Sequence, residues 1–294
     1  PIIGTVQDST LAPYLFTTGY TKLNRDQYQQ ALAAAFTNDF KMINFNRDIP
    51  NAGYNVETLL SMMFPEHFAY TSKNLKVLNG NVTNSKPIIN KSNLVAGNYN
   101  TIFHQAFNTL GAMATNRLFN EFAKFANEYF IQTGFTTSIE DCFPPDSTFL
   151  PMIKKYIERY DEYISKLIWL VSDIPINKRV DVLSKMDLPD NIKKSWKDFL
   201  IHNNTEINEM YPTFVQSMWN SFAKDVEQAV FNAYEKSPHN GLYQMITSGS
   251  KGSKKNLTAI IGLLGQQDVD GHWVLEEMAH RTLPHFAKDT NTPY

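Results

Sequence analysis

LFNEFAKFANEYFIQTG, residues 118–134, is the stretch of sequence that decides the fold. Its apolar side chains recur three and four positions apart, at Leu118, Phe122, Phe125, Tyr129 and Phe130. This spacing places them on one face of a helix, and Gly134 stands at the position where many helices end. The pattern predicts a long helix from Thr101 to Thr133.

Upstream of that helix the sequence is mixed. Asn24 is a candidate cap for a helix over Asp26–Phe36, and a second short helix follows Asn55. The first twenty residues are interrupted by Gly4, Pro13 and Gly19, which predicts an irregular segment.

A hairpin is expected between Leu75 and Val82. Leu75 and Val77 alternate with Lys76, and Asn79-Gly80 follows Leu78. This dipeptide favours the type I′ turn that joins two antiparallel strands. The pattern therefore predicts a small β element in an otherwise helical chain.

Downstream of the long helix, Phe135–Asp141 is expected to be a strand or an extended loop, and Asp146 or Ser147 a cap for a helix reaching Trp169. Asp173–Pro189 is polar and contains prolines, which predicts a loop with at most one helical turn. Two further amphipathic helices are expected over residues Asp190–Asn203 and Pro212–Glu235.

These patterns predict an α+β fold that is predominantly helical. A small mixed domain with a β hairpin, residues 1–143, is followed by a helical domain, residues 144–294. The boundary is placed at Pro144-Pro145, where the mixed pattern gives way to a helical one.

Composition excludes several classes of protein. The formal net charge is -2 and the pI is near 6.4, so the chain has no overall field that attracts nucleic acid. Cys142 is the single cysteine, which excludes an internal disulfide and favours a reducing compartment. No apolar run reaches the roughly 20 residues of a membrane span. A soluble intracellular protein with no membrane partner is expected, in the nucleus or in the cytoplasm.

The segment with the most chemical content is Met245–Lys255, MITSGSKGSKK, which leads into an apolar run. Free backbone N-H groups, a helix dipole and lysine ammonium groups would together favour a phosphate there. However, the loop lacks the ending of a P-loop, and runs of Gly, Ser and Lys are more often solvated connectors. The pattern alone favours a connector.

Metal and nucleophile sites have weaker support. Glu277 and His280 have a spacing that can place two ligands on one helix face, but there is no second copy of the motif. Cys142 follows Glu140 and Asp141, whose charges disfavour a thiolate. We therefore expect neither a metal site nor a nucleophilic cysteine.

Several segments, taken in order, resemble the largest subunit of multisubunit RNA polymerases, in its eukaryotic, archaeal and large-DNA-virus form. They are PIIGTVQDS (1–9), the stretch from Asn79 to Leu94, GFTTSIED (134–141), GLYQM (241–245) with SGSKGS (248–253), GQQDVDG (265–271) and RTLPHF (281–286). The second and third are similar to the pore domain, the next two to the funnel, and the last to the approach to the bridge helix.

The resemblance implies that the chain lines the secondary channel of a DNA-directed RNA polymerase, as a fragment or a separately encoded part of the subunit. By this resemblance, Lys251 contacts the triphosphate of the incoming nucleotide, whereas Asn256, Gln266 and Gln267 lie near the bridge helix. Ala259 replaces a residue that is often polar in the family.

The resemblance also implies a set of partners. These are the other polymerase subunits or the rest of the largest subunit, nucleoside triphosphates, DNA and RNA, and a transcript-cleavage factor. The aspartate-rich motif that holds catalytic Mg²⁺ is absent from the sequence. We therefore expect this segment to bind no cofactor, Mg²⁺ to belong to the complete polymerase, and the isolated chain not to synthesise RNA.

Two alternatives remain open at the level of sequence. One is a helical interaction module unrelated to transcription, in which the Gly/Ser/Lys loop is a solvated connector. The other is a free-standing phosphate-binding enzyme. Co-purification with polymerase subunits would favour the polymerase interpretation over both alternatives. Nucleotide turnover by the isolated chain would favour the enzyme.

Overall fold

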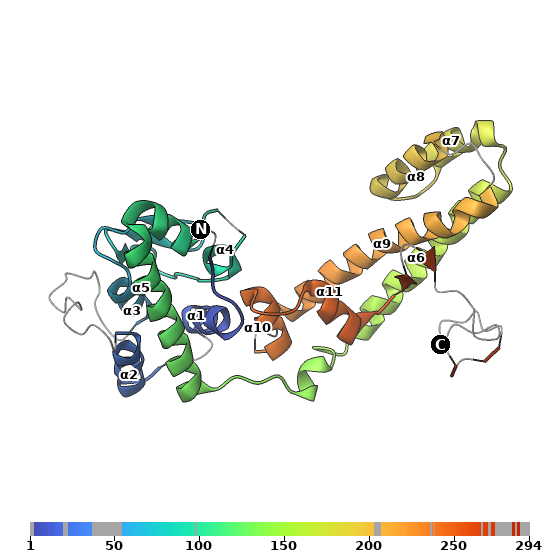
Figure 1. Cartoon of the computed structure of the whole chain (residues 1–294). Helices are drawn as coiled ribbons and strands as arrows, with labels where there is room; N and C mark the ends of the chain where they lie inside the picture. Colours follow the sequence, from blue (N-terminus) through green and yellow to red (C-terminus); the bar gives the residue numbers. More distant parts are fainter. Residues whose placement is uncertain are drawn as a thin grey trace. The chain divides into compact units, whose positions relative to one another are not determined.

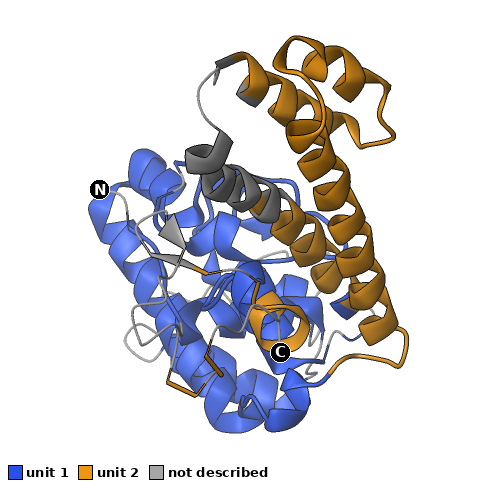
Figure 2. Cartoon of the chain, turned by 90° about the vertical axis from the view of Figure 1, so that its right-hand side faces the viewer, with its two compact units in different colours: residues 1–143, 234–257 blue, residues 144–233, 258–294 orange. Residues whose placement is uncertain are grey.

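The computed structural model describes residues 3–19, 23–36, 55–97, 99–202, 207–235, 237, 239–265, 267–269, 272–273, 284–285 and 287–288. The chain divides into two compact units, coloured separately in Figure 2. The first consists of residues 1–143 and 234–257, and the second of residues 144–233 and 258–294. The predicted fold class, α+β and predominantly helical, is confirmed (Figure 1).

The first unit is built around α5 (Ile102–Thr133), the helix predicted from the 3–4 spacing. Its buried face includes Phe122, Phe125 and Tyr129. The Phe125 ring meets Phe16 of α1 (Asp8–Thr18) edge-on, with ring centroids 5.1 Å apart. Gly111, with φ of 83°, interrupts the helix at a point that the apolar spacing did not indicate.

The helix α1 corrects the expectation that the first twenty residues are irregular. Pro13 lies inside it, although an interior proline costs a helix about 3 kcal/mol. Leu11, Leu15 and Phe16 are all buried, and burying such a side chain contributes about 1.5–3 kcal/mol. Packing against the rest of the unit therefore outweighs the local penalty.

Two further helices of this unit follow their predicted caps. Asn24 forms a capping box at the start of α2 (Arg25–Ala35), with its side chain accepting from the Gln27 N-H. Asn55 accepts from the Thr58 N-H at the start of α3 (Val56–Met63). Both caps satisfy N-H groups that a helix start leaves without partners.

The predicted hairpin is present and belongs to a three-stranded antiparallel sheet in the order β1 (Tyr70–Thr71), β2 (Lys76–Leu78), β3 (Asn81–Val82). Val77 pairs with both Tyr70 and Val82. Asn79 and Gly80 have φ of 48° and 71°, as a type I′ turn requires. The short helix α4 (Lys91–Leu94) follows the sheet.

The C-terminal side of α5 leads into the one-turn 3-10 helix η2 (Ile139–Cys142). The expected strand or extended loop over Phe135–Asp141 is therefore wrong in its second half, where Ser138 and Asp141 form a capping box instead. The first unit is completed by α10 (Gly241–Ser248) and α11 (Lys254–Leu257).

The second unit contains the helices α6 (Phe149–Ser172), α7 (Ile176–Lys185), α8 (Asp190–His202) and most of α9 (Ile207–Tyr234). Helices α6, α8 and α9 were predicted, but the N-cap of α6 is Thr148, whose backbone N-H donates to the Asp146 carboxylate. Tyr160 of α6 stacks on Phe222 of α9 with ring centroids 4.3 Å apart. The unit also includes a π-helical turn, η3 (Thr258–Gly262), and a pair of short strands, β4 (Asp268–Val269) and β5 (His272–Trp273).

The ten-residue helix α7 corrects the expectation of a loop over Asp173–Pro189. Pro175 is its N-cap residue and Pro189 directly precedes α8, so both prolines mark helix starts and neither interrupts a helix. Leu183 and Arg179 are the buried residues of α7.

Among the described residues, no helix is both long enough and apolar enough to cross a bilayer.

Candidate functional site

Several of the sequence segments singled out above meet within the first unit. At the N-terminal segment, the Thr5 N-H donates to the Leu94 carbonyl at the end of α4 over 2.9 Å. Gly4 lies so close to this turn that a Cβ there would be 2.1 Å from the Ala96 nitrogen. Helix α10 also packs against α1. Residues that are far apart in sequence thus converge around α4 and α10.

The loop Ser248–Ser253, which we call the Lys251 loop, leaves the C-terminus of α10. Gly249 has φ of 79° and ψ of 17°, the left-handed conformation that commonly ends a helix. The Met245 carbonyl accepts from the Ser250 N-H at 3.1 Å and from the Lys251 N-H at 3.4 Å. The Ser248 and Ser250 hydroxyls donate to the same carbonyl, at 2.9 and 3.2 Å. The loop is therefore tied to the last turn of α10.

The far end of the loop is fixed by a reciprocal cap on α11. The Ser253 N-H and hydroxyl donate to the Asn256 side-chain oxygen over 2.8 and 2.7 Å. In return, the Asn256 N-H donates to the Ser253 hydroxyl over 3.3 Å. The side chain of Asn256, for which the resemblance implies a position near the bridge helix, thus has a local structural role at its carbonyl oxygen.

These hydrogen bonds change the case for a phosphate site. The sequence suggested free backbone N-H groups in this loop, but those of Gly249, Ser250, Lys251 and Ser253 donate to protein oxygens. The cation that the loop offers an anion is the side chain of Lys251, which is exposed and makes no ion pair within the part of the chain that the structure describes.

A second cationic residue, Lys91 of α4, borders the loop. A Cβ on Gly249 would lie 2.3 Å from the Lys91 Cβ and 2.7 Å from its Cδ, so the aliphatic stem of Lys91 passes directly against the loop backbone. Sequence reasoning did not single out Lys91, because the contact joins residues that are distant along the chain.

The sequence around both lysines lacks negative charge. Residues 67–120, which include Lys91, and residues 236–267, which include Lys251, contain no Asp or Glu. The first unit carries 14 Lys and Arg against 11 Asp and Glu, whereas the second carries 13 against 18. The nearly neutral chain thus divides into a positive unit and a negative one.

The start of α10 is held by Asp141 of η2. One carboxylate oxygen accepts from the Gly241 N-H over 2.9 Å, and the other accepts from the Ser138 N-H over 2.8 Å. The Asn240 side chain donates to the Asp141 carbonyl over 2.9 Å and caps α10 by accepting from the Tyr243 N-H. Asn240 before a helical run is a cap signal that the sequence could have revealed, but its link to Asp141 is not local.

The remaining predicted site residues lie in the second unit. Gln267 is exposed, and its side-chain amide donates to the carbonyls of Leu264 and Gly265 over 3.1 and 3.2 Å. Gln266 lies outside the described residues. The structure therefore places Lys251 on the loop and Asn256 in α11, which caps the end of that loop, whereas Gln267 belongs to the other unit.

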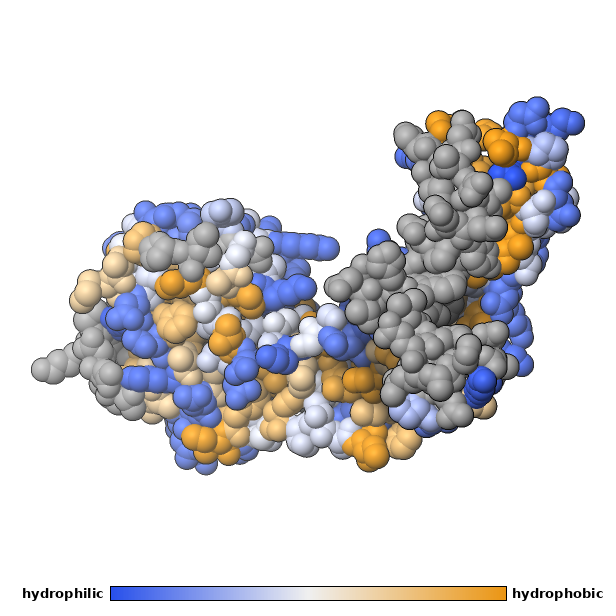
Figure 3. Space-filling view, turned by 45° about the vertical axis from the view of Figure 1, so that its right-hand side comes forward, coloured by the Kyte–Doolittle hydropathy of each residue, from blue (hydrophilic) through white to orange (hydrophobic). Residues whose placement is uncertain are grey.

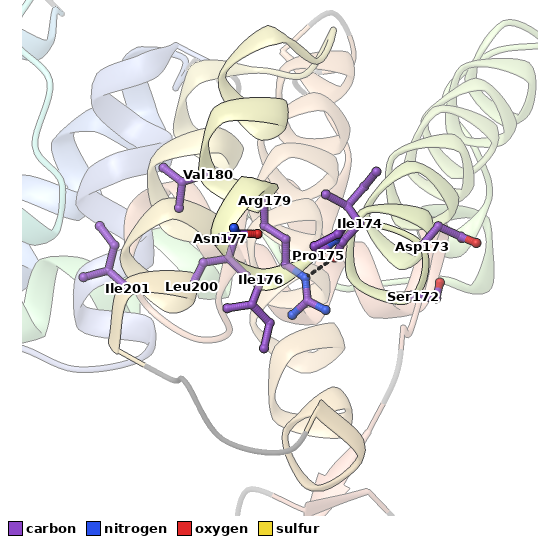
Figure 4. Close-up of a pocket in the computed structure, with 10 residues that line it drawn as sticks. All are labelled: Ser172, Asp173, Ile174, Pro175, Ile176, Asn177, Arg179, Val180, Leu200 and Ile201. Atoms are coloured by element: carbon purple, nitrogen blue, oxygen red, sulfur yellow. Dashed lines mark hydrogen bonds between the residues drawn. The ribbon is translucent and has the colours of Figure 1, made fainter.

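An open pocket of about 960 Å³ in the second unit is lined by residues of α7, α8 and the end of α6 (Figure 4). The Arg179 guanidinium points into it and donates to the Ile174 carbonyl over 2.8 Å and to the Val171 carbonyl over 2.7 Å. These bonds satisfy one carbonyl in the last turn of α6 and one in the segment between α6 and α7. The charge of Arg179 thus serves the fold, and none of the lining residues belongs to the segments that resemble polymerase.

Within the described ranges, no group of three or more His, Cys, Asp or Glu side chains lies close enough together to hold a metal ion.

The fold and the site define a predominantly helical α+β protein that presents a lysine on an anchored loop. Comparison with known families assigns the chain further: residues 1–142 match the description "RNA polymerase Rpb1, domain 3", and residues 197–294 match "RNA polymerase Rpb1, domain 4". The chain belongs to the family of the largest subunit of multisubunit RNA polymerases. It is thus part of a transcription enzyme that works with other subunits, which argues against an interaction module unrelated to transcription.

Proposed function

We propose that this chain lines the pore and funnel of a DNA-directed RNA polymerase, the secondary channel through which nucleoside triphosphates reach the active site, and that Lys251 contacts the triphosphate. The observation that carries the proposal is an exposed lysine on a loop whose backbone is anchored at both ends. The match to the Rpb1 domains supports the setting.

The chemistry of the contact is that of an ammonium group with phosphate oxygens. Charge-assisted hydrogen bonds of this kind are shorter and stronger than neutral ones. A lysine acts as a point charge on a long stem, so it can follow a nucleotide that moves past it. The N-H groups of Gly249, Ser250, Lys251 and Ser253 already donate to protein oxygens, so the proposed contact is made by the Lys251 side chain.

The neighbouring Lys91 also supports the proposal. Its stem lies against Gly249, and both lysines lie in long stretches without acidic residues. A local excess of positive charge raises the concentration of polyanions such as nucleoside triphosphates near a channel wall.

The partners proposed for the chain follow from the same setting. DNA, RNA and a transcript-cleavage factor would engage the assembled enzyme, with Asn256, Gln266 and Gln267 toward the bridge helix and Mg²⁺ bound elsewhere. Surfaces for other subunits would include exposed apolar side chains; Met113, Ile131 and Ile139 are 86%, 78% and 78% exposed. Figure 3 shows hydrophobic residues at the surface on the face in view.

Nucleotide kinetics of the assembled polymerase test the proposal. A charge-assisted contact is worth about 1.5–3 kcal/mol, and solvent access places this one at the lower end. Lys251→Ala should therefore reduce kcat/KM for nucleotides by about tenfold, with assembly unchanged. Lys255→Ala, which removes an exposed lysine from the neighbouring α11, is the matched control. Lys254→Ala is a second control.

Equal losses at all three lysines would indicate general basicity, with no directed contact. Unchanged nucleotide kinetics in the assembled Lys251→Ala enzyme would indicate that the loop is a solvated connector.

A further inference from the structure

The carboxylate of Asp141 joins two segments that are a hundred residues apart in sequence. Its two oxygens accept from the backbone N-H groups of Gly241 and Ser138, over 2.9 and 2.8 Å. Its carbonyl accepts from the Asn240 side chain over 2.9 Å. The whole residue therefore binds the turn that precedes α10, and this junction lies entirely within the first unit.

The junction is also tightly packed. A Cβ at Gly241 would lie 2.9 Å from the Thr136 carbonyl oxygen and 3.1 Å from both the Asp141 carboxylate and the Thr137 methyl group. Glycine is therefore the residue that lets the two backbones approach this closely. The start of α10 has little freedom to shift along η2.

Helix α10 transmits this restraint to the Lys251 loop. It has eight residues, which corresponds to a length of about 12 Å. Isolated helices this short are marginal in water, so tertiary anchors decide whether α10 forms and where it points. The loop is bonded to the Met245 carbonyl in the last turn of α10, and Gly249 rests on Lys91. Asp141 at one end and Lys91 at the other thus set the position of Lys251.

We propose that Asp141 is a positioning residue, which holds α10 so that Lys251 meets the nucleotide triphosphate. The inference rests on the proposed function of Lys251. Asp141 itself does not touch the nucleotide in this account.

Asp141→Asn is the sharpest substitution, because it keeps the size of the side chain. An amide offers one acceptor oxygen where the carboxylate offers two, and its NH₂ group would face a backbone donor. One of the two bonds to Gly241 and Ser138 must therefore be lost. Glu140→Gln is the matched control, since Glu140 is the exposed neighbour and its substitution removes the same charge.

The test is a double-mutant cycle in the assembled polymerase, with nucleotide KM and kcat measured per active enzyme. We expect Asp141→Asn to raise KM about threefold, with kcat unchanged, and Glu140→Gln to change neither. In the Lys251→Ala background, Asp141→Asn should have no further effect, because residues that act through one contact are not additive. A purely structural defect would instead lower the active fraction and leave KM unchanged.

The outcomes separate the two claims. If Lys251→Ala raises KM but Asp141→Asn does not, the positioning role is overturned and the proposed function stands. An equal effect of Asp141→Asn with and without Lys251 would also overturn it. If Lys251→Ala has no effect, both claims fail. If the Asp141→Asn enzyme does not assemble, Asn240→Ala is the second variant, because it removes the bond to the Asp141 carbonyl. Its effect on KM must then also disappear in the Lys251→Ala background. An effect on KM that is the same with and without Lys251 overturns the inference.

Discussion

The two units differ in charge and in the interactions that their helices display. The first has a net charge of +3 and a core of interlocking aromatic rings around α5. The second has a net charge of -5, and its helices α6 and α7 carry exposed ion pairs between residues four apart, such as Asp181 and Lys185 at 3.1 Å. Exposed pairs of this kind contribute little to stability.

The contrast indicates that the two units differ in what they contribute to stability and to nucleotide handling. A positive unit with a dense core is suited to hold a lysine loop near phosphates, because its backbone positions are fixed by buried side chains. In the second unit, the Tyr160–Phe222 stack and the hydrogen bonds of Arg179 link the helices, and the excess of acidic residues does not favour polyanions. Substitutions in each unit can therefore test whether stability and nucleotide handling divide in this way.

The largest effect is expected in the core of the first unit. Phe122 is fully buried and meets Phe103 and Phe64. Phe122→Ala should destabilise the chain by about 3–5 kcal/mol, because it leaves a cavity. Denaturant unfolding measures the loss, and Phe143→Ala, at a side chain that is 59% exposed, is the control. Similar effects of both substitutions would contradict a core centred on α5.

The next effect concerns the junction between the loop and α4. Gly249→Ala combines a left-handed backbone with a clash against Lys91, and should cost about 2–4 kcal/mol. Gly19 has nearly the same conformation, with φ of 73° and ψ of 17°, but open space around it. Gly19→Ala should therefore cost only about 1–2 kcal/mol. If thermal unfolding shows equal costs, the packing of Lys91 against the loop is not a restraint.

In the second unit, Arg179→Ala removes two hydrogen bonds, one to the Val171 carbonyl in the last turn of α6 and one to the Ile174 carbonyl between α6 and α7. Bonds from a charged donor are worth about 1.5–3 kcal/mol. We expect faster hydrogen exchange in the last turn of α6 and in α7, and no change in α5 of the first unit. Arg159→Ala, at an exposed position of α6, should leave both regions unchanged. Loosening that spreads equally to α5 would argue that the two units do not behave separately.

The smallest effect appears in strongly alkaline solution. Burial, with smaller contributions from Cys142 and Asp141, raises the pKa of Tyr234 from 10.0 to about 12. The folded chain therefore keeps a proton that the unfolded chain loses. This contribution to stability is complete below pH 10 and is lost between pH 10 and about 12.

Tyr234→Phe should flatten the pH dependence of the free energy of unfolding over that range. The substitution also removes the bond from the Tyr234 hydroxyl to the Phe143 carbonyl, so stability should already be lower at neutral pH. An identical alkaline slope for the two proteins would mean that Tyr234 does not titrate differently on folding.

Local signals in the sequence predicted several elements correctly. The spacing in residues 118–134 predicted α5, Asn24 and Asn55 predicted two helix starts, and Asn79-Gly80 predicted the hairpin turn. Each of these depends on interactions within a few residues. The sequence does not predict α1 and α7, because Pro13 and Pro175 are typical of interruptions. Tertiary burial of α1 outweighs the helix-breaking effect of Pro13, and Pro175 lies at the start of α7.

The candidate site was predicted only in part. The sequence singled out the Lys251 loop, but it suggested open backbone N-H groups where the structure shows hydrogen bonds to Met245 and Asn256. The roles of Lys91 and Asp141 could not be predicted, because each contact joins residues about a hundred or more positions apart. No local pattern encodes such a contact. The placement of Gln266 and Gln267 near a bridge helix and the division at Pro144-Pro145 remain predictions.

The most direct test of the central claim is to locate a bound nucleotide chemically. A nucleoside triphosphate that carries an amine-reactive group on its terminal phosphate would be added to the assembled polymerase, and the labelled lysine identified by mass spectrometry. The account predicts labelling at Lys251, abolished by Lys251→Arg and by competition with unmodified nucleotide, with Lys255 unlabelled. Labelling that avoids Lys251 and falls on Lys255 or on lysines of the second unit would contradict it.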